Sequence, residues 1–140
     1  MSTEHPQKRA PASASETIRA AIDAAATALA GADAEVPSAA LPLLRVAQEH
    51  VTAAIDEAMA AVLVSEGSTI RTARALAGLS ENAVGPRLAR TRLLAAYGSE
   101  SGRVTAAGVE RARYDLEEGR HRPGPDASDR PLGFRARRST

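Results

Sequence analysis

Alanine dominates the hydrophobic part of this chain and constrains how it can fold. Of the 140 residues, 32 are Ala, against 29 larger apolar residues (12 Leu, 8 Val, 4 Ile, 2 Met, 2 Tyr and 1 Phe). Alanine has the highest helix propensity and suits close helix packing, whereas the β-branched and aromatic residues are too few and too scattered for a sandwich or a barrel. We therefore predict a mainly α-helical fold of one-domain size with a thin core.

The composition also excludes several classes of function. The chain has no Cys, which rules out disulfides, thiolate metal sites and thiol catalysis. No apolar run could span a bilayer and no secretory signal is present, so we expect a cytoplasmic protein without membrane contact. No His or carboxylate set has metal-ligand spacing, and no nucleophile has a base nearby. We expect neither enzyme activity nor a metal or cofactor.

The small net charge of +1 hides a strong asymmetry. Residues 1–67 carry 4 Lys and Arg against 9 Asp and Glu, whereas residues 68–140 carry 14 Arg against 8 Asp and Glu. A basic half points to an anionic partner such as nucleic acid. A dipolar surface without any partner would give the same numbers.

Hydrophobic periodicity predicts a long amphipathic helix that starts at residue 41 or 42 and ends at 65. Apolar residues recur there at spacings of three and four, and Pro42 suits the first helical position. A shorter helix is expected over about 16–30, because Ser13 and Glu16 have capping-box spacing. The long helix, over 42–65, is expected to pair two copies into a homodimer.

Periodicity also divides the chain into parts. Residues 1–14 are rich in Ala, Pro and Ser, and residues 119–140 mix Pro, Gly and Arg without a period, so we predict a disordered leader and a disordered basic tail. Residues 15–40 would form the N-terminal helix and a linker. Residues 41–118 would form the main domain, with a last helix over about 106–118.

The stretch TIRTARALAGLSENAVGPRL, residues 69–88, predicts two short helices joined by a tight turn. A glycine supplies the positive φ, an aliphatic residue plugs the turn from below, and a serine caps the second helix. Two apolar residues further on would lock the second helix onto the first, which leaves its polar start exposed. These residues are Gly78, Leu79, Ser80, Val84 and Leu88. The second helix is expected to end by about residue 97.

This pattern resembles the helix-turn-helix unit of DNA-binding regulators, and residues 68–118 are similar to the winged members of that superfamily. The short segment around Arg103 stands where those proteins have a β wing, and Thr105 stands where the following helix begins. The resemblance implies a helix-turn-helix core with a small wing, and a transcriptional regulator that binds double-stranded DNA. A simple loop is the alternative to the wing.

Two residues depart from the pattern. Arg74 falls where such units commonly have a small residue, and a turn one residue longer would shift Ala73 into that place. Pro86 lies inside the expected second helix, where it lacks an N–H and would clash with the carbonyl of Asn82. The second helix therefore starts either at Glu81 or near Pro86.

The expected DNA contacts follow from residue chemistry. Arginine binds phosphates and guanine edges, and asparagine can pair with adenine, although Asn also favours helix starts. The expected phosphate contacts are Arg71, Arg87, Arg90, Arg92 and Arg103. The residues expected to orient or read base edges are Ser80, Glu81, Asn82 and Arg87, with a shift toward Arg87 and Arg90 if the helix starts at Pro86.

A second class of function stays open. The Ala-rich long helix and the acidic N-terminal half would also suit a helical protein-interaction module, such as an adaptor or an antitoxin-like partner, that binds no nucleic acid. RNA binding is less favoured, because the chain has only one Phe and two Tyr for base stacking.

Overall fold

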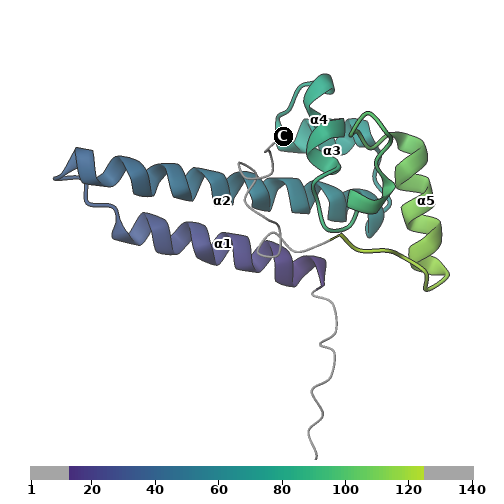
Figure 1. Cartoon of the computed structure of the whole chain (residues 1–140), viewed down its shortest axis with the longest axis horizontal. Helices are drawn as coiled ribbons and strands as arrows, with labels where there is room; N and C mark the ends of the chain where they lie inside the picture. The colour runs from purple at the N-terminus through teal and green to yellow at the C-terminus, as the bar shows by residue number, and fades with distance from the viewer. Residues whose placement is uncertain (1–12, 125–140) are drawn as a thin grey trace, which may run out of the picture.

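A long helical hairpin projects from a compact group of short elements (Figure 1). The computed structural model describes residues 13–124 and contains, within that range, five α-helices, one 3-10 turn and no strand. The predicted mainly α-helical fold is confirmed. The predicted leader and most of the predicted tail, residues 1–12 and 125–140, lie outside the described residues.

The hairpin is formed by α1 (Ala14–Gly31) and α2 (Pro37–Val64), which run antiparallel (Figure 1). The capping box at the start of α1 is present: Glu16 N donates to Ser13 Oγ at 3.1 Å, and Ser13 N donates to Glu16 Oε1 at 2.9 Å. Four alanines supply the buried side chains of the hairpin up to residue 47: Ala25, Ala28, Ala40 and Ala47. Alanine content thus sets the close packing of these two helices.

Helix α2 begins earlier than the periodicity predicts. It starts at Pro37 instead of residue 41 or 42, and Pro42 lies inside it. Pro37 fills the first-turn position for which Pro42 had been expected, because that position needs no N–H. The interior Pro42 removes the helical partner of the Ser38 carbonyl, which is tolerated where Ser38 is exposed to water.

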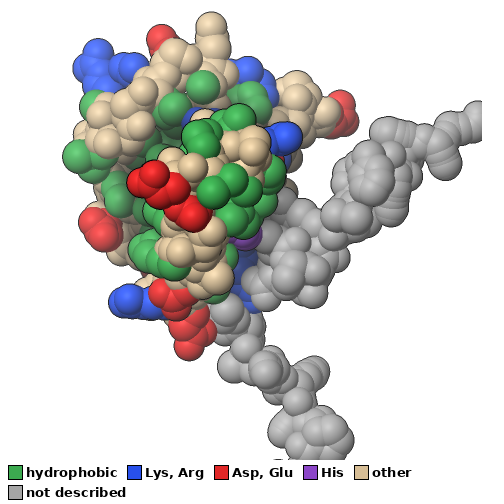
Figure 2. Space-filling model, turned by 90° about the vertical axis from the view of Figure 1, so that its left-hand side faces the viewer, with side chains coloured by type: hydrophobic (Ala, Val, Ile, Leu, Met, Phe, Trp, Pro, Cys, Tyr) green, Lys and Arg blue, Asp and Glu red, His purple; other side chains and the backbone are tan. Residues whose placement is uncertain are grey.

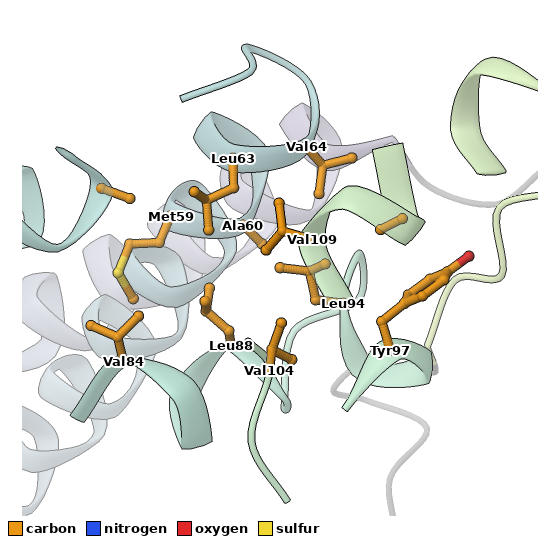
Figure 3. Packing of buried hydrophobic residues seen from close by; sticks show 12 residues of the cluster. Met59, Ala60, Leu63, Val64, Val84, Leu88, Leu94, Tyr97, Val104 and Val109 are labelled. Carbon is orange, nitrogen blue, oxygen red and sulfur yellow. The ribbon is translucent and has the colours of Figure 1, made fainter. Parts of the chain in front are cut away.

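The C-terminal half wraps short elements around the last turns of α2. They are α3 (Ile70–Ala77), α4 (Glu81–Leu88), the 3-10 turn η1 (Ala95–Tyr97) and α5 (Ala106–Glu117). Their apolar side chains converge on α2 (Figure 3). The core contains Met59, Ala60, Leu63, Val64, Ala73, Val84, Leu88, Leu94, Tyr97, Val104, Val109 and Ala112.

One arginine fastens α5 to the end of α2. Arg113 Nε donates to the Leu63 carbonyl at 2.9 Å, and its Nη2 donates to the Ser68 carbonyl at 2.7 Å. The third contact is an ion pair with Glu110 at 2.7 Å. A helix C-terminus leaves carbonyls without intrahelical partners, and a guanidinium satisfies them while complementing the negative end of the dipole.

Helix α4 is shorter than predicted. It ends at Leu88, and the chain then turns into η1 instead of continuing as a helix to residue 97. The buried Thr91 supports the turn, because its hydroxyl donates to the Leu88 carbonyl at 2.7 Å and accepts from Leu94 N at 3.2 Å. Such local side-chain hydrogen bonds compete with a helix.

The prediction of disorder is wrong for residues 119–124, which pack against the turn between α4 and η1. His121 Nε2 lies 2.8 Å from the Leu93 carbonyl, and Gly124 N donates to the Arg92 carbonyl at 2.6 Å. Gly124 is buried, and a Cβ there would lie 2.6 Å from Ala95 Cβ. The absence of a side chain lets this segment approach closely, which composition alone could not indicate.

We expect Leu63→Ala to lower the free energy of unfolding by about 2–5 kcal/mol, because Leu63 is fully buried at the centre of the core. Leu116→Ala, at a half-exposed position on α5, is the matched control and should cost less than about 1 kcal/mol. Urea unfolding followed by circular dichroism measures both. Equal losses in the two variants would show that the core is not centred on α2.

Candidate nucleic-acid interface

A left-handed glycine joins α3 to α4. Gly78 has φ 71°, and the N–H of Leu79 closes the turn by donating to the Arg74 carbonyl at 3.1 Å. Ala73 is buried, as the longer turn predicts, so Ala73 and not Arg74 takes the place of the small residue. Arg74 Nη1 instead donates to the Leu79 carbonyl at 3.3 Å, which ties the guanidinium to the turn.

The structure decides where the second helix starts. Helix α4 begins at Glu81, and Pro86 lies inside it with its ring exposed. Ser80 occupies the N-cap position, but its side chain makes no capping hydrogen bond, so its predicted role as a side-chain cap is wrong. The first turn of α4 is instead closed by a backbone hydrogen bond, in which Ala83 N donates to the Ser80 carbonyl at 3.2 Å.

Three of the predicted contact residues lie together at the exposed start of α4. They are Ser80, Glu81 and Asn82. The opposite side of the same helix is buried, with Val84 and Leu88 in the core. The helix therefore presents its polar start to solvent while its apolar side holds it in place.

A loop over residues 98–105 stands where a wing had been expected, and it contains no strand. Ser99 N donates to the Arg103 carbonyl at 2.8 Å, which closes the loop on itself. The next residue bonds elsewhere: Val104 N donates to the Gly85 carbonyl at 3.0 Å. The chain is thus tied to α4 instead of pairing into a hairpin, so the loop alternative holds.

Arg103 lies across α4 at Gly85. A Cβ built on Gly85 would come within 3.2 Å of both Cβ and Nε of Arg103. Glycine at this position therefore lets the arginine pass close to the helix backbone. The sequence does contain a signal, since a glycine kept inside a predicted helix often has a packing reason.

Arg87 was predicted to contact DNA, but its side chain is mostly buried and pairs with another residue of the chain. Its Nε donates to Asp56 Oδ1 at 2.7 Å, and the two side chains are 21% and 10% exposed. Burial raises the pKa of Asp56, and the hydrogen bond and charge of Arg87, together with the charge of Arg90, offset only part of that effect. This ion pair joins α4 to α2.

Arg92 is also engaged within the chain, and its predicted phosphate contact stays a prediction. Its backbone N–H donates to both carboxylate oxygens of Glu57, at 3.1 and 3.0 Å, and Nη1 donates to the Gly124 carbonyl at 3.2 Å. The side chain is half-buried. Arg71, on α3, and Arg90, just after α4, are exposed.

Sequence reasoning missed the role of Asp56 and Glu57, which hold the chain at and after α4 against α2. Adjacent carboxylates point to different sides of a helix and form no acid–base couple. Here Asp56 binds the side chain of Arg87 on α4, and Glu57 binds the backbone N–H of Arg92 after the end of α4. The signal was available: Asp56 shares a helical face with Met59, Ala60 and Leu63, and a charge on an apolar face needs a partner.

No family model, no curated protein and no solved structure matches this chain. The resemblance to helix-turn-helix regulators therefore stays a prediction. Within residues 13–124, no group of three or more His, Cys, Asp or Glu side chains could hold a metal ion. None of the helices in that range combines the length and the apolar character needed to cross a membrane.

The pH dependence of stability should carry the signature of Asp56. Because its pKa is raised in the native state, the folded chain binds more protons than the unfolded chain between the two pKa values. The free energy of unfolding, relative to that of Asp56→Asn, should therefore fall as the pH rises from about 4 through the native pKa. Urea titrations at a series of pH values measure this difference, and a rise over the same range would contradict it.

Proposed function

We propose that the chain binds double-stranded DNA through α3 and α4 and regulates transcription. One observation carries the proposal: two short helices meet at the left-handed Gly78, the second is locked by Val84 and Leu88, and its polar start is exposed. A helix held in this way can enter a major groove with its first residues against the base edges.

The charge around α4 supports an anionic partner. Residues 68–124 carry 10 Arg against 6 Asp and Glu. Arg71 and Arg90 are exposed, and Arg103 is half-buried where it lies across α4 at Gly85. In this proposal these three arginines neutralise phosphates and release counterions.

Base reading would fall to the start of α4. Asn82 can pair with adenine through both groups of its amide, and Glu81 can accept from the amino group of cytosine. Ser80 can bond to either a base or a phosphate. Arg87 takes a positioning role, because its ion pair with Asp56 fixes α4 relative to α2.

A homodimer completes the proposed mechanism. Two copies would place their α4 helices in successive major grooves about 34 Å apart, which suits a palindromic site. The long helix α2, predicted as the dimerisation element, contributes exposed apolar side chains such as Val51.

The second candidate, a helical protein-interaction module without nucleic-acid binding, is favoured by a different observation. The hairpin exposes large apolar side chains, among them Ile22, Leu29 and Leu41. Patches of that kind mark protein contacts. Nucleic-acid binding and its salt dependence separate the two candidates.

Fluorescence anisotropy of a labelled duplex at several salt concentrations tests DNA binding. Three phosphate contacts per copy, six in the proposed dimer, predict a slope of about −5 in log affinity against log salt. Arg71→Ala, which removes one contact from each copy, should weaken binding to all sequences and reduce the slope by about 2. Arg45→Ala, whose exposed partner Glu49 lies on the hairpin, should change neither. No binding at low salt would overturn the proposal.

Asn82→Ala should relax sequence preference instead of general affinity. Loss of a bidentate base contact costs about 1–3 kcal/mol of discrimination at one base pair. Selection from a random duplex pool, with wild type and variant in parallel, measures the change. Because Asn82 is exposed, the unfolding free energy should stay within about 0.5 kcal/mol of wild type. An unchanged preference would remove Asn82 from the proposed readout.

A further inference from the structure

The hairpin buries its small side chains and exposes larger ones. Ala25 and Ala28 of α1 are buried, whereas Ile22 and Leu29 on the same helix are 49% and 52% exposed. Seen from the tip of the hairpin, green hydrophobic side chains reach the surface among acidic ones (Figure 2). A helix pair with this arrangement lacks the layer that would cover its larger apolar side chains.

The apolar side chains that line this side of the hairpin form two parallel seams. On α1 they follow spacings of four, three and four, and on α2 the spacings are the same. Such a pattern is that of helices whose side chains interlock with other helices. The seams are Ile18, Ile22, Ala25 and Leu29 on α1, and Val51, Ile55, Ala58 and Val62 on α2. We name this surface the hairpin face.

The hairpin face is hollowed along its length. A groove of about 460 Å³ runs between the two seams, from Ile18 to Leu29 on α1. A second hollow of about 190 Å³ continues it between α2 and α3, where Leu76 is 75% exposed. The two hollows share Ile55 and Ala58, so the apolar surface is continuous from the hairpin onto α3.

We propose that a second copy of this chain docks on the hairpin face, so that the two hairpins form a four-helix bundle. The partner must offer two apolar seams at a matching separation, and the same face of another copy does so. Helix α1 then contributes as much to the interface as the long helix α2. This extends the homodimer beyond pairing through residues 42–65 alone.

The chemistry of the hairpin face suits a partner identical to itself. No residue that lines either hollow has a charged or polar side chain. In a two-fold interface each patch meets its own copy, so a charged patch would repel itself. An uncharged patch carries no such penalty and gives no preference to a charged partner.

The area is sufficient for a specific dimer. The α2 seam extends for about 17 Å over residues 51–62 at 1.5 Å per residue, and about 27 Å if Leu44, which is exposed one heptad earlier, is included. Two packed helices are together about 18–20 Å wide. The longer footprint is about 500 Å² on each copy, or about 1,000 Å² in the pair, which reaches the size expected of a biological interface.

Helix α1 also needs such a partner for its own stability. Only Ala25 and Ala28 of its 18 residues are buried in the single chain. Most helical stability in proteins comes from tertiary packing of an apolar face, and alanine contributes little burial. Docking of a second copy would cover Ile18, Ile22 and Leu29.

The inference rests on the proposed function in one respect, because it says how two copies of the proposed DNA-binding chain meet. Its test uses no DNA, so the dimer and the DNA binding can each fail without the other. Analytical ultracentrifugation of the full chain at about 50 μM should give twice the 14.5 kDa mass of one copy. Val51→Glu should weaken the dimer at least tenfold. Val46→Glu, at a valine of similar exposure on another face of α2, is the control and should leave it intact.

Leu29→Glu tests the α1 seam in the same way and decides the question if Val51→Glu fails to fold, as judged by circular dichroism. A monomeric wild type would overturn the proposal, whether residues 125–140 or another protein covers the face instead. A dimer that resists Val51→Glu and Leu29→Glu but dissociates with Val46→Glu would also overturn it, because the copies would then meet through another surface.

Discussion

The C-terminal half of the molecule depends on the burial of the last turns of α2. Leu63 is fully buried there, and Met59, Ala60 and Val64 lie around it among side chains from all the short elements (Figure 3). Short helices such as α3 and α4, with eight residues each, are marginal by themselves. Their position and their stability both come from this one helix end.

Two polar contacts extend that dependence to the candidate interface. Asp56 binds Arg87 of α4, and Arg113 of α5 binds the Leu63 carbonyl. A partly buried ion pair contributes more to geometry than to net stability, because desolvation offsets much of its attraction. The orientation of α4 is therefore set by α2, whether or not the pair adds to the unfolding free energy.

Periodicity and turn chemistry were enough to predict much of the fold. The helix pattern, the capping box at Ser13 and the positive φ of Gly78 rest on local interactions, which a single sequence displays directly. The start of α2 was misplaced because Pro37 and Pro42 carry the same local signal. The end of α4 was missed because the sequence does not show that Thr91 is buried and bonds to Leu88 and Leu94. The packing of residues 119–124 was missed because it depends on contacts with residues 92 and 93, which are distant in sequence.

The candidate site shows the same division. Exposure of Ser80, Glu81 and Asn82 follows from the helical period and was predictable. The engagement of Arg87 and Arg92 was not, because their guanidinium groups bond to Asp56 and to the Gly124 carbonyl, each more than thirty residues away. Residue type indicates that an arginine can bind a phosphate, but only the fold shows which other groups its guanidinium already contacts.

The continuity of α2 fixes the angle between the hairpin face and the short helices packed on its last turns. One helix carries Val51 and Ile55 on the hairpin face and Asp56 and Leu63 toward the core. Each residue of an α-helix adds about 100° of rotation and 1.5 Å of rise. The number of residues between these positions therefore sets the angle of α4 relative to the hairpin. A single inserted or deleted residue in this part of α2 would rotate the hairpin face by about 100° relative to α4.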